Sequence, residues 1–264
     1  MRIHNSFFHN TFLKRIFPLA AYCLCGIGIL TFIYTNYCSP AITSSKVGDR
    51  HLPIYCVDCG DDKKIALSFD AAWGNEDTKQ ILDILAKHNV KVTFFMTGGW
   101  VESYPDDVKA ILAAGHDLGN HSENHKHMSQ LSTADQKEEL MKVHEKVKEL
   151  TDYEMFLFRP PYGDYNNSVI TNATDCGYYT IQWDVDSLDW KNYGVDSIIN
   201  TVTNHKHLGP GSIILCHNGA DYTAAALDSM IHKLKEQGYE FVPISELIYK
   251  ENYHMNHEGR QILD

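Results

Sequence analysis

Five apolar runs in this 264-residue chain each lead into side chains that can carry out chemistry. The set comprises an acid, two imidazoles, a guanidinium, a cluster of acids with indoles, and one further imidazole. In chain order they are Asp70 after 65–70, His121 and His125 after 116–120, Arg159 ending 156–159, residues 183–190 ending 178–184, and His217 ending 212–217. Acids and imidazoles transfer protons and bind metals, so the set indicates acid–base or metal-assisted chemistry.

Each of these side chains has an ordinary structural explanation when it is taken alone. Asp70 can simply begin a loop, Arg159 can be a surface residue on a rigid turn, and His217 can be a core histidine satisfied by backbone. It is improbable that such an explanation is correct at all five strand ends at once. Because α/β enzymes place their chemistry at the carboxyl ends of strands, we expect the side chains to form one site.

The pair His121 and His125 has a spacing that suits a metal ion. Two histidines four residues apart share one face of a helix, where both imidazoles can reach one divalent cation. Such pairs also arise by chance in a chain with 15 histidines, and Lys126-His127 lies next to this one. The spacing alone therefore leaves metal binding and an ordinary polar segment both open.

The segment Arg159-Pro160-Pro161-Tyr162-Gly163 is rigid. Two prolines fix the backbone after the apolar run, so Arg159 is held in place and the next free amide, that of Tyr162, has a fixed direction. A fixed N–H group near a metal is what an oxyanion needs.

Alternating apolar runs and amphipathic stretches predict an α/β fold. The expected strands are 65–70, 91–97, 116–120, 156–159, 178–184, 212–217 and 239–243. The expected helices include one that begins near Pro105 and one capped by Ser132 and Asp135, followed by helices over 167–176 and 223–237. The run 65–70 lacks polar alternation, as a strand buried on both faces does. Seven alternations predict a parallel-stranded domain, with barrel closure favoured over an open sheet.

Composition and the N-terminus bear on partners and compartment. A net charge of −11 argues against nucleic acid as a partner. Residues 16–35 carry no charge and are long enough to cross a bilayer, and Lys14 and Arg15 place the N-terminus in the cytoplasm. Cys56 and Cys59 form a single CxxC, which gives no four-thiolate zinc site and leaves a disulfide and a free pair both open.

These features predict five segments. They are a cytoplasmic N-terminus (1–15), a transmembrane helix or signal anchor (16–36), a linker (37–62), a catalytic domain (63–250) and a polar, disordered tail (251–264). The expected location is the cell membrane, with a single span and the domain outside the cytoplasm. A signal peptide cleaved near Ser39-Pro40-Ala41, which would give a secreted protein, is the alternative.

Taken in this order, the motifs resemble the polysaccharide deacetylase family, the NodB-homology domain of carbohydrate esterase family 4. The resemblance covers about Lys64 to Ile248, and Trp73-Gly74 after the first motif is similar to the membrane-anchored, sporulation-type members. It implies a distorted (β/α)7 barrel (NodB-like). It also implies an enzyme that removes N- or O-acetyl groups with one divalent metal ion.

The resemblance also implies a role for each motif residue. Asp70 matches the general base and His217 the general acid. The remaining roles are metal ligation by His121 and His125, orientation of the base by Arg159, tuning of the acid by Asp189 in the motif with Trp190, oxyanion binding by the Tyr162 amide, and an acetyl-methyl pocket lined by Leu215.

One position departs from the family pattern. The family has a second Asp, a metal ligand, where this chain has Ala71. Three outcomes are open. Asp70 takes over as the ligand; waters or another acid, such as Glu76 or Asp77, fill the position; or binding is weak and activity is low. We expect a divalent ion, Zn²⁺ in the first place with Co²⁺ or another ion as alternatives, bound more weakly than in the family.

The expected function is metal-dependent removal of N-acetyl groups from an extracellular polysaccharide, either peptidoglycan or a chitin-like polymer. Two alternatives remain open at this stage. One is a glycan-binding pseudoenzyme with an impaired metal site, and the other is an O-acetyl esterase that acts on xylan.

Overall fold

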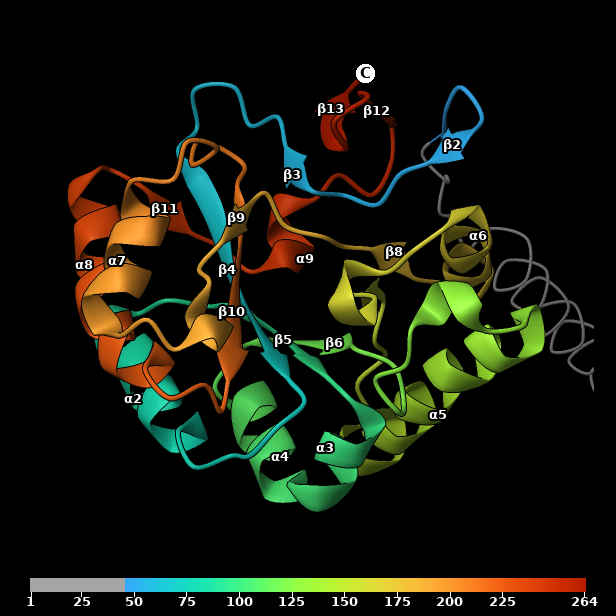
Figure 1. Cartoon of the computed structure of the whole chain (residues 1–264), viewed down its shortest axis with the longest axis horizontal. Coiled ribbons are helices and arrows are strands. Elements are labelled where there is room, and N and C mark those ends of the chain that lie inside the picture. Colours follow the sequence, from blue (N-terminus) through green and yellow to red (C-terminus); the bar gives the residue numbers. More distant parts are fainter. Residues whose placement is uncertain (1–45) are drawn as a thin grey trace, which may run out of the picture. The chain divides into compact units, whose positions relative to one another are not determined.

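The computed structural model describes residues 46–264 (Figure 1). The predicted cytoplasmic segment 1–15 and the predicted membrane span 16–36 lie outside these residues, as does the first part of the predicted linker. Among the helices of the described part, none combines the length and the apolar character that a membrane crossing requires.

One parallel sheet forms the centre of the domain. Its order is β8-β7-β6-β5-β4-β10-β9, and β11 also pairs with β4. The strands are β4 (Lys64–Ala71), β5 (Thr93–Met96), β6 (Asp117–Asn120), β7 (Leu157–Phe158), β8 (Tyr179–Thr180), β9 (Val185–Asp186), β10 (Ile213–Asn218) and β11 (Glu240–Phe241). Every predicted strand is present, although most are shorter than expected. The sheet curls into a half-barrel consistent with the distorted barrel, and its end strands β8 and β9 do not pair with each other in residues 46–264.

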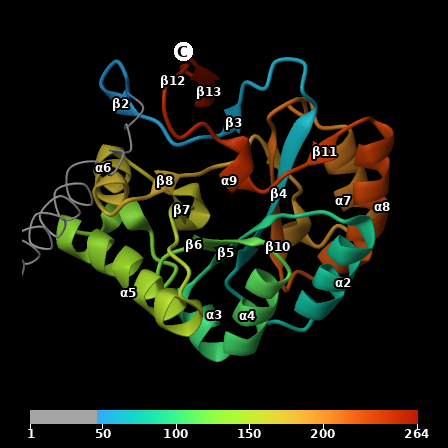
Figure 2. The same ribbon diagram turned by 180° about the vertical axis from the view of Figure 1, so that it is seen from behind.

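Helices cover the outer face of the curled sheet, as Figures 1 and 2 show from opposite sides. They are α2 (Thr78–His88), α3 (Gly98–Ser103), α4 (Pro105–Ala113), α5 (Thr133–Thr151), α6 (Asn167–Asp175), α7 (Val195–Thr203) and α8 (Thr223–Glu236). The short α9 (Ile244–Leu247) lies apart from this layer, and its buried residues pack with Ala66 and Phe95. The predicted helix starts are confirmed. Pro105 is the first residue of α4, and the Ser132 hydroxyl accepts a hydrogen bond from the Asp135 amide at the start of α5.

Strand β4 separates the two apolar clusters of the core. Ile65, Leu67, Phe69 and Ala71 face a cluster shared with the outer helices, whereas Ala66 belongs to a second cluster inside the half-barrel. Alternation along the strand therefore directs Asp70 to the inner side, as it does Ser68. This is why a continuously apolar run can deliver one buried carboxylate to the centre of the domain.

The tail is ordered, which corrects the prediction of a disordered segment over 251–264. Strands β12 (Tyr253–Met255) and β13 (Arg260–Leu263) form a small sheet with β3 (Cys56–Val57), which lies in the predicted linker. The Gln261 side chain is fully buried and bonds both the amide and the carbonyl of Tyr249. The polar composition misled the prediction because these polar groups are satisfied internally.

The residues before β3 are also part of the ordered unit. Strands β1 (Lys46–Val47) and β2 (Arg50–His51) form a hairpin, and Ile54 is buried. Cys56 and Cys59 are free thiols, which leaves the disulfide alternative without support. The ordered domain thus extends well before residue 63.

Candidate active site

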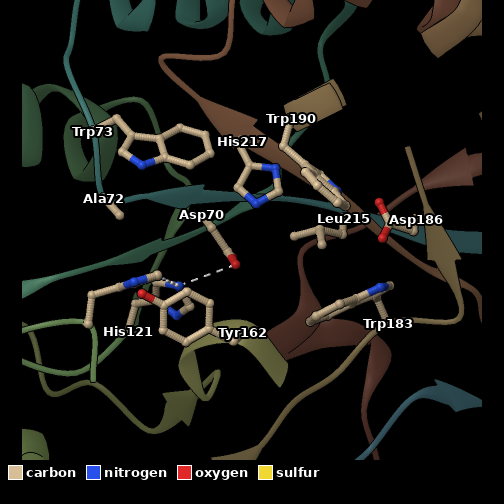
Figure 3. A pocket seen from close by; sticks show the side chains of 11 residues that line it. Asp70, Ala72, Trp73, His121, Tyr162, Trp183, Asp186, Trp190, Leu215 and His217 are labelled. Carbon is tan, nitrogen blue, oxygen red and sulfur yellow. Dashed lines mark hydrogen bonds and ion pairs between the residues drawn. The ribbon is translucent and has the colours of Figure 1, made fainter. Parts of the chain in front are cut away.

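A cavity of about 430 Å³ opens at the carboxyl ends of the central strands (Figure 3). Its volume lies in the range of small-molecule sites. Its walls are Asp70, Ala72, Trp73, His121, His125, Tyr162, Trp183, Asp186, Trp190, Leu215 and His217. All of the residues predicted to form the site line this cavity except Arg159 and Asp189, and both of these contact lining residues from behind.

Arg159 is fully buried and holds Asp70 in place. Its Nη1 donates to Asp70 Oδ1 over 2.7 Å, and its Nη2 donates to Ser68 Oγ over 2.8 Å. The guanidinium also lies 4.2 Å from the centre of the Phe95 ring. A surface arginine on a rigid turn is thereby ruled out. A buried ion pair that is hydrogen-bonded in this way fixes the direction of the carboxylate.

Asp70 is ionised at neutral pH. Burial by itself raises the pKa of this carboxyl, but the interactions with His121 and Arg159, including the hydrogen bond from Arg159, outweigh burial and hold the pKa below its usual value. We ascribe the effect to Arg159, because burial lowers the pKa of His121 and leaves that imidazole neutral at pH 7. With Oδ1 bound to Arg159, Oδ2 is the oxygen available to the cavity.

His121 and His125 direct ring nitrogens toward each other. His121 Nδ1 lies 2.7 Å from the Arg159 carbonyl oxygen, which can only accept, so Nδ1 carries the proton and Nε2 offers a lone pair. His125 Nε2 is 3.2 Å from His121 Nε2. Burial lowers the pKa of His125 to about 4, so this imidazole too is neutral. Two neutral imidazoles at this distance share one proton or bind one cation.

The two histidines meet through a loop, so the helical rationale for their spacing is wrong. Residues 121–127 form no helix, and Ser122 and His125 have positive φ angles of 64° and 52°. The loop is held by side chains instead. Asn120 Oδ1 accepts from the Ser122 amide, and Ser122 Oγ accepts from the His125 amide. The two imidazoles do lie together, but polar loop contacts rather than helix geometry bring them together.

The metal-ligand set is incomplete compared with the family pattern. Ala71 is fully buried among apolar residues on the helix side and offers no ligand atom. Glu76 and Asp77 do not line the cavity, and Asp77 Oδ1 accepts from the Gly219 amide. Asp70 Oδ2 lies 3.4 Å from His121 Nε2 (dashed line in Figure 3).

Across residues 46–264, no three His, Cys, Asp or Glu side chains are close enough together to hold a metal ion. The donors that are present still suit a divalent ion, because His121 and His125 direct imidazole nitrogens to one point. Asp70 Oδ2 lies beside them.

Asp189 holds His217 from behind. Its Oδ1 lies 2.7 Å from His217 Nδ1, and its Oδ2 accepts from the His217 amide and from the Thr223 hydroxyl. Burial lowers the pKa of His217, but the hydrogen bond and the charge of the fully buried Asp189 outweigh it, so the net pKa is raised. With Nδ1 bound to Asp189, Nε2 is left to deliver a proton into the cavity.

Tyr162 adopts the left-handed backbone conformation, with φ of 60°. This conformation is unfavourable for a residue with a side chain, and the two preceding prolines hold the chain in place. The ring is 62% exposed and packs against His125 and His127, with centroid distances of 4.6 Å and 4.3 Å. Tyr162 therefore supports the imidazole pair in addition to offering its amide.

Four residues that line the cavity were given no individual role from the sequence. They are Ala72, Trp73, Trp183 and Asp186. Trp73 stacks on His217 with ring centroids 5.1 Å apart. Its position directly after the Asp70 strand was a usable signal, as was the density of indoles and acids over residues 183–190.

Comparison with known proteins agrees with this geometry. Residues 58–181 match the family described as polysaccharide deacetylase. The chain is 39% identical to a peptidoglycan-N-acetylglucosamine deacetylase of Bacillus cereus, over 71% of this chain and 89% of the relative. The chain belongs to the polysaccharide deacetylase family. Another member, the peptidoglycan-N-acetylmuramic acid deacetylase PdaA of Bacillus subtilis, is 37% identical over 72% of this chain and 73% of its own.

A related solved structure shows that enzymatic activity varies within the family. A carbohydrate esterase family 4 pseudoenzyme from Bacillus anthracis is 38% identical, with a TM-score of 0.71 over 75% of this chain and 69% of its own. A mutant of that protein is described as having restored enzymatic activity. Polysaccharide deacetylase folds of this similarity therefore include both active and inactive members.

Proposed function

We propose that this polysaccharide deacetylase removes N-acetyl groups from an extracellular glycan, either peptidoglycan or a chitin-like polymer. One observation carries the proposal: two separately paired groups, Asp70 with Arg159 and His217 with Asp189, face a single cavity. Asp70 is an ionised base, and His217 is an imidazole whose proton is stabilised by Asp189. A domain that only binds glycan needs neither arrangement.

The chain's own residues supply acid, base and oxyanion donor. Asp70 Oδ2 accepts a proton from the attacking water, and the Tyr162 amide donates to the carbonyl oxygen as it becomes negative. His217 then protonates the leaving amine nitrogen as the C–N bond breaks, and acetate is released. Leu215 and Trp183 form the apolar wall for the acetyl methyl group.

A divalent ion held by His121 and His125 would supply Lewis-acid chemistry, by polarising the acetyl carbonyl and acidifying a water molecule. Imidazole nitrogens suit zinc among other ions, so Zn²⁺ is the ion we propose. We expect binding weaker than in the family, because Ala71 provides no ligand. Arg159 occupies Oδ1 of Asp70, so only Oδ2 is available to the cavity. Because Oδ2 cannot bind an ion and accept a proton at the same time, we assign Asp70 the role of general base.

The function is tested by acetate release from N-acetylated chito-oligosaccharides and from peptidoglycan, with Zn²⁺ or Co²⁺ added. We expect release by the wild type and its loss in His217→Ala, with zinc affinity unchanged because His217 is not a ligand. Unchanged acetate release from His217→Ala would refute its role. The pseudoenzyme alternative, which Ala71 favours, predicts glycan binding without acetate under any metal.

We also propose that the domain acts outside the cytoplasm, at the cell membrane, with residues 16–36 as a single anchor. The uncharged segment and the preceding Lys14 and Arg15 support this arrangement. A protease added to intact cells should remove a C-terminal epitope tag while the membrane fraction retains the N-terminus. A tag that is protected until the cells are lysed would contradict the proposal, and a tagged domain in the medium would indicate cleavage.

A further inference from the structure

Helix α5 supports the loop that carries His121 and His125. It holds this loop by hydrogen bonds at two places, one at Asn120 before the first histidine and one at Asn124 before the second. No residue of α5 lines the active-site cavity. The helix can therefore influence the histidine pair only through the position of the loop.

Glu139 of α5 makes the contact at the second place, and this side chain is 4% exposed. Its Oε2 accepts from the Asn124 amide over 2.7 Å, and its Oε1 accepts from Asn124 Nδ2 over 2.8 Å. Lys126 Nζ lies 3.0 Å from Oε1. Burial raises the pKa of Glu139, but the interactions with Asn124 and Lys126 outweigh it and hold the pKa below its usual value. An ionised carboxylate thus ties the residues on either side of His125 to the helix.

Tyr178 acts at the first place through Asn120, and both side chains are fully buried. Asn120 Nδ2 donates to the Tyr178 hydroxyl over 3.1 Å and to the Leu140 carbonyl oxygen of α5 over 2.8 Å. These two bonds use both protons of the amide group and fix its orientation. Asn120 Oδ1 is thereby directed to the Ser122 amide, from which it accepts a hydrogen bond over 2.9 Å.

His144 of α5 fixes the direction in which the Tyr178 hydroxyl donates. His144 Nε2 lies 2.8 Å from Glu154 Oε2, and a carboxylate only accepts, so Nε2 carries the proton. In the neutral ring Nδ1 is then an acceptor, and it lies 2.7 Å from the Tyr178 hydroxyl oxygen. Burial raises the pKa of Tyr178, so its hydroxyl keeps the proton that it donates. A chain of hydrogen bonds therefore runs from the surface through Tyr178 to the loop.

We propose that Glu139 and Tyr178 are positioning residues, which hold the imidazole pair at the spacing that one divalent ion requires. This inference rests on the proposed function, because it takes His121 and His125 as metal ligands. Ser122 and His125 have positive φ angles of 64° and 52°, which residues with side chains adopt at a cost. The hydrogen bonds from outside the loop offset that cost. A pair that is already ordered binds an ion without the cost of ordering the loop.

Glu139 has a matched control in the adjacent residue of the same helix. In Glu139→Gln one carboxylate oxygen becomes an NH2 donor that faces a donor of Asn124, in a side chain of the same size. Glu138→Gln makes the same chemical change in a side chain that is 57% exposed and pairs with Lys142. Only the first variant alters a contact with the loop.

Tyr178 likewise has a matched control in its neighbour along the chain. Tyr178→Phe removes the hydroxyl that contacts Asn120. Tyr179→Phe removes a hydroxyl that donates to the Lys250 carbonyl oxygen over 2.9 Å, and the two rings belong to different apolar clusters. Both variants lose a phenol hydrogen bond, but only Tyr178→Phe affects the loop, which separates positioning from a general loss of stability.

The test is calorimetric titration with zinc at pH 8, where an ordinary imidazole is neutral. We expect the zinc Kd to rise about tenfold to a hundredfold in Glu139→Gln, as is usual when a group behind a metal ligand is changed. The rise in Tyr178→Phe, one bond further from the ligands, should be about threefold to tenfold. Both controls should stay within about twofold of wild type.

A zinc Kd at the wild-type value in a positioning variant, or an equal rise in that variant and its control, would overturn the role of that residue. Acetate release by wild type is measured beside the titrations. Release that persists while the zinc Kd is unchanged in both positioning variants would overturn the inference and leave the proposed function standing.

Amide hydrogen exchange, measured by NMR on metal-free protein, tests the same roles without zinc or turnover. The Asn124 amide should exchange about tenfold faster in Glu139→Gln, and the Ser122 amide about tenfold faster in Tyr178→Phe, since each loses support worth about one hydrogen bond. If wild type binds no zinc, the metal part of the proposed function is wrong and these rates decide the positioning. Rates at the wild-type value in both variants would overturn it.

Discussion

Removal of Arg159 should expose how strongly the active site depends on one buried ion pair. The Arg159 side chain is 0% exposed and that of Asp70 is 6% exposed, and Nη1 and Oδ1 are 2.7 Å apart. Removal of one partner from such a pair costs about 3–5 kcal/mol, because the other charge stays buried and unpaired. For a domain of this size that corresponds to a fall in Tm of about 6–20 °C.

Urea unfolding of Arg159→Leu, followed by tryptophan fluorescence, measures this free energy. The double variant Arg159→Leu/Asp70→Asn removes both charges, and we expect it to be more stable than Arg159→Leu alone. The matched control is Lys79→Ala, which breaks the exposed pair of Lys79 with Asp83 and should cost less than about 1 kcal/mol. A loss below about 1 kcal/mol for Arg159→Leu, or a double variant no more stable than the single one, would refute the reasoning.

Four further predictions concern His217 and the metal site. Asp189→Asn removes the charge that raises the pKa of His217, so the alkaline limb of the pH profile of kcat/KM should move to lower pH. An alkaline limb at the wild-type pH would show that another group is the general acid. A group with a raised folded pKa stabilises the fold below its unfolded pKa and loses this contribution as pH rises through the folded value. Asp189→Asn should therefore cost more free energy of unfolding at pH 6 than at pH 9, and equal costs would contradict the linkage. Ala71→Asp should lower Tm in metal-free protein, because it buries an unpaired carboxyl, and zinc should then raise Tm more than it does in wild type. An equal response of both proteins to zinc would show that position 71 cannot supply a ligand. A chelator should abolish acetate release, and His121→Ala should prevent its recovery with zinc.

The location of the active site was predictable because each chemical side chain ends an apolar run. Parallel strands bring their carboxyl ends to one edge, so Asp70, Arg159 and His217 had to meet once the strands were assigned. The pairing of Asp189 with His217 followed from the family resemblance, and the structure places the two groups 2.7 Å apart. The periodicity of the sequence was therefore enough to predict most of the strands and the edge of the sheet at which the site lies.

The parts that were not predictable depend on loop contacts and on very short elements. The approach of His121 to His125 needs positive φ angles and hydrogen bonds from Asn120 and Ser122, which no helical spacing reveals. Strand β3 has two residues and β12 three, too few for any periodicity to show. The buried position of the Glu123 carboxylate depends on the space that Gly98 leaves for it, a contact that exists only after folding.

The central claim is that Asp70 and His217 act together as base and acid on an N-acetyl group. The most direct measurement is acetate release, with equimolar free amine, from tetra-N-acetylchitotetraose by wild type, Asp70→Asn and His217→Ala, each loaded with zinc and each shown to bind the tetrasaccharide. The account predicts equal amounts of acetate and amine from wild type and at least a hundredfold loss in each variant. Binding by all three proteins with no acetate from wild type, at any zinc concentration, would contradict it.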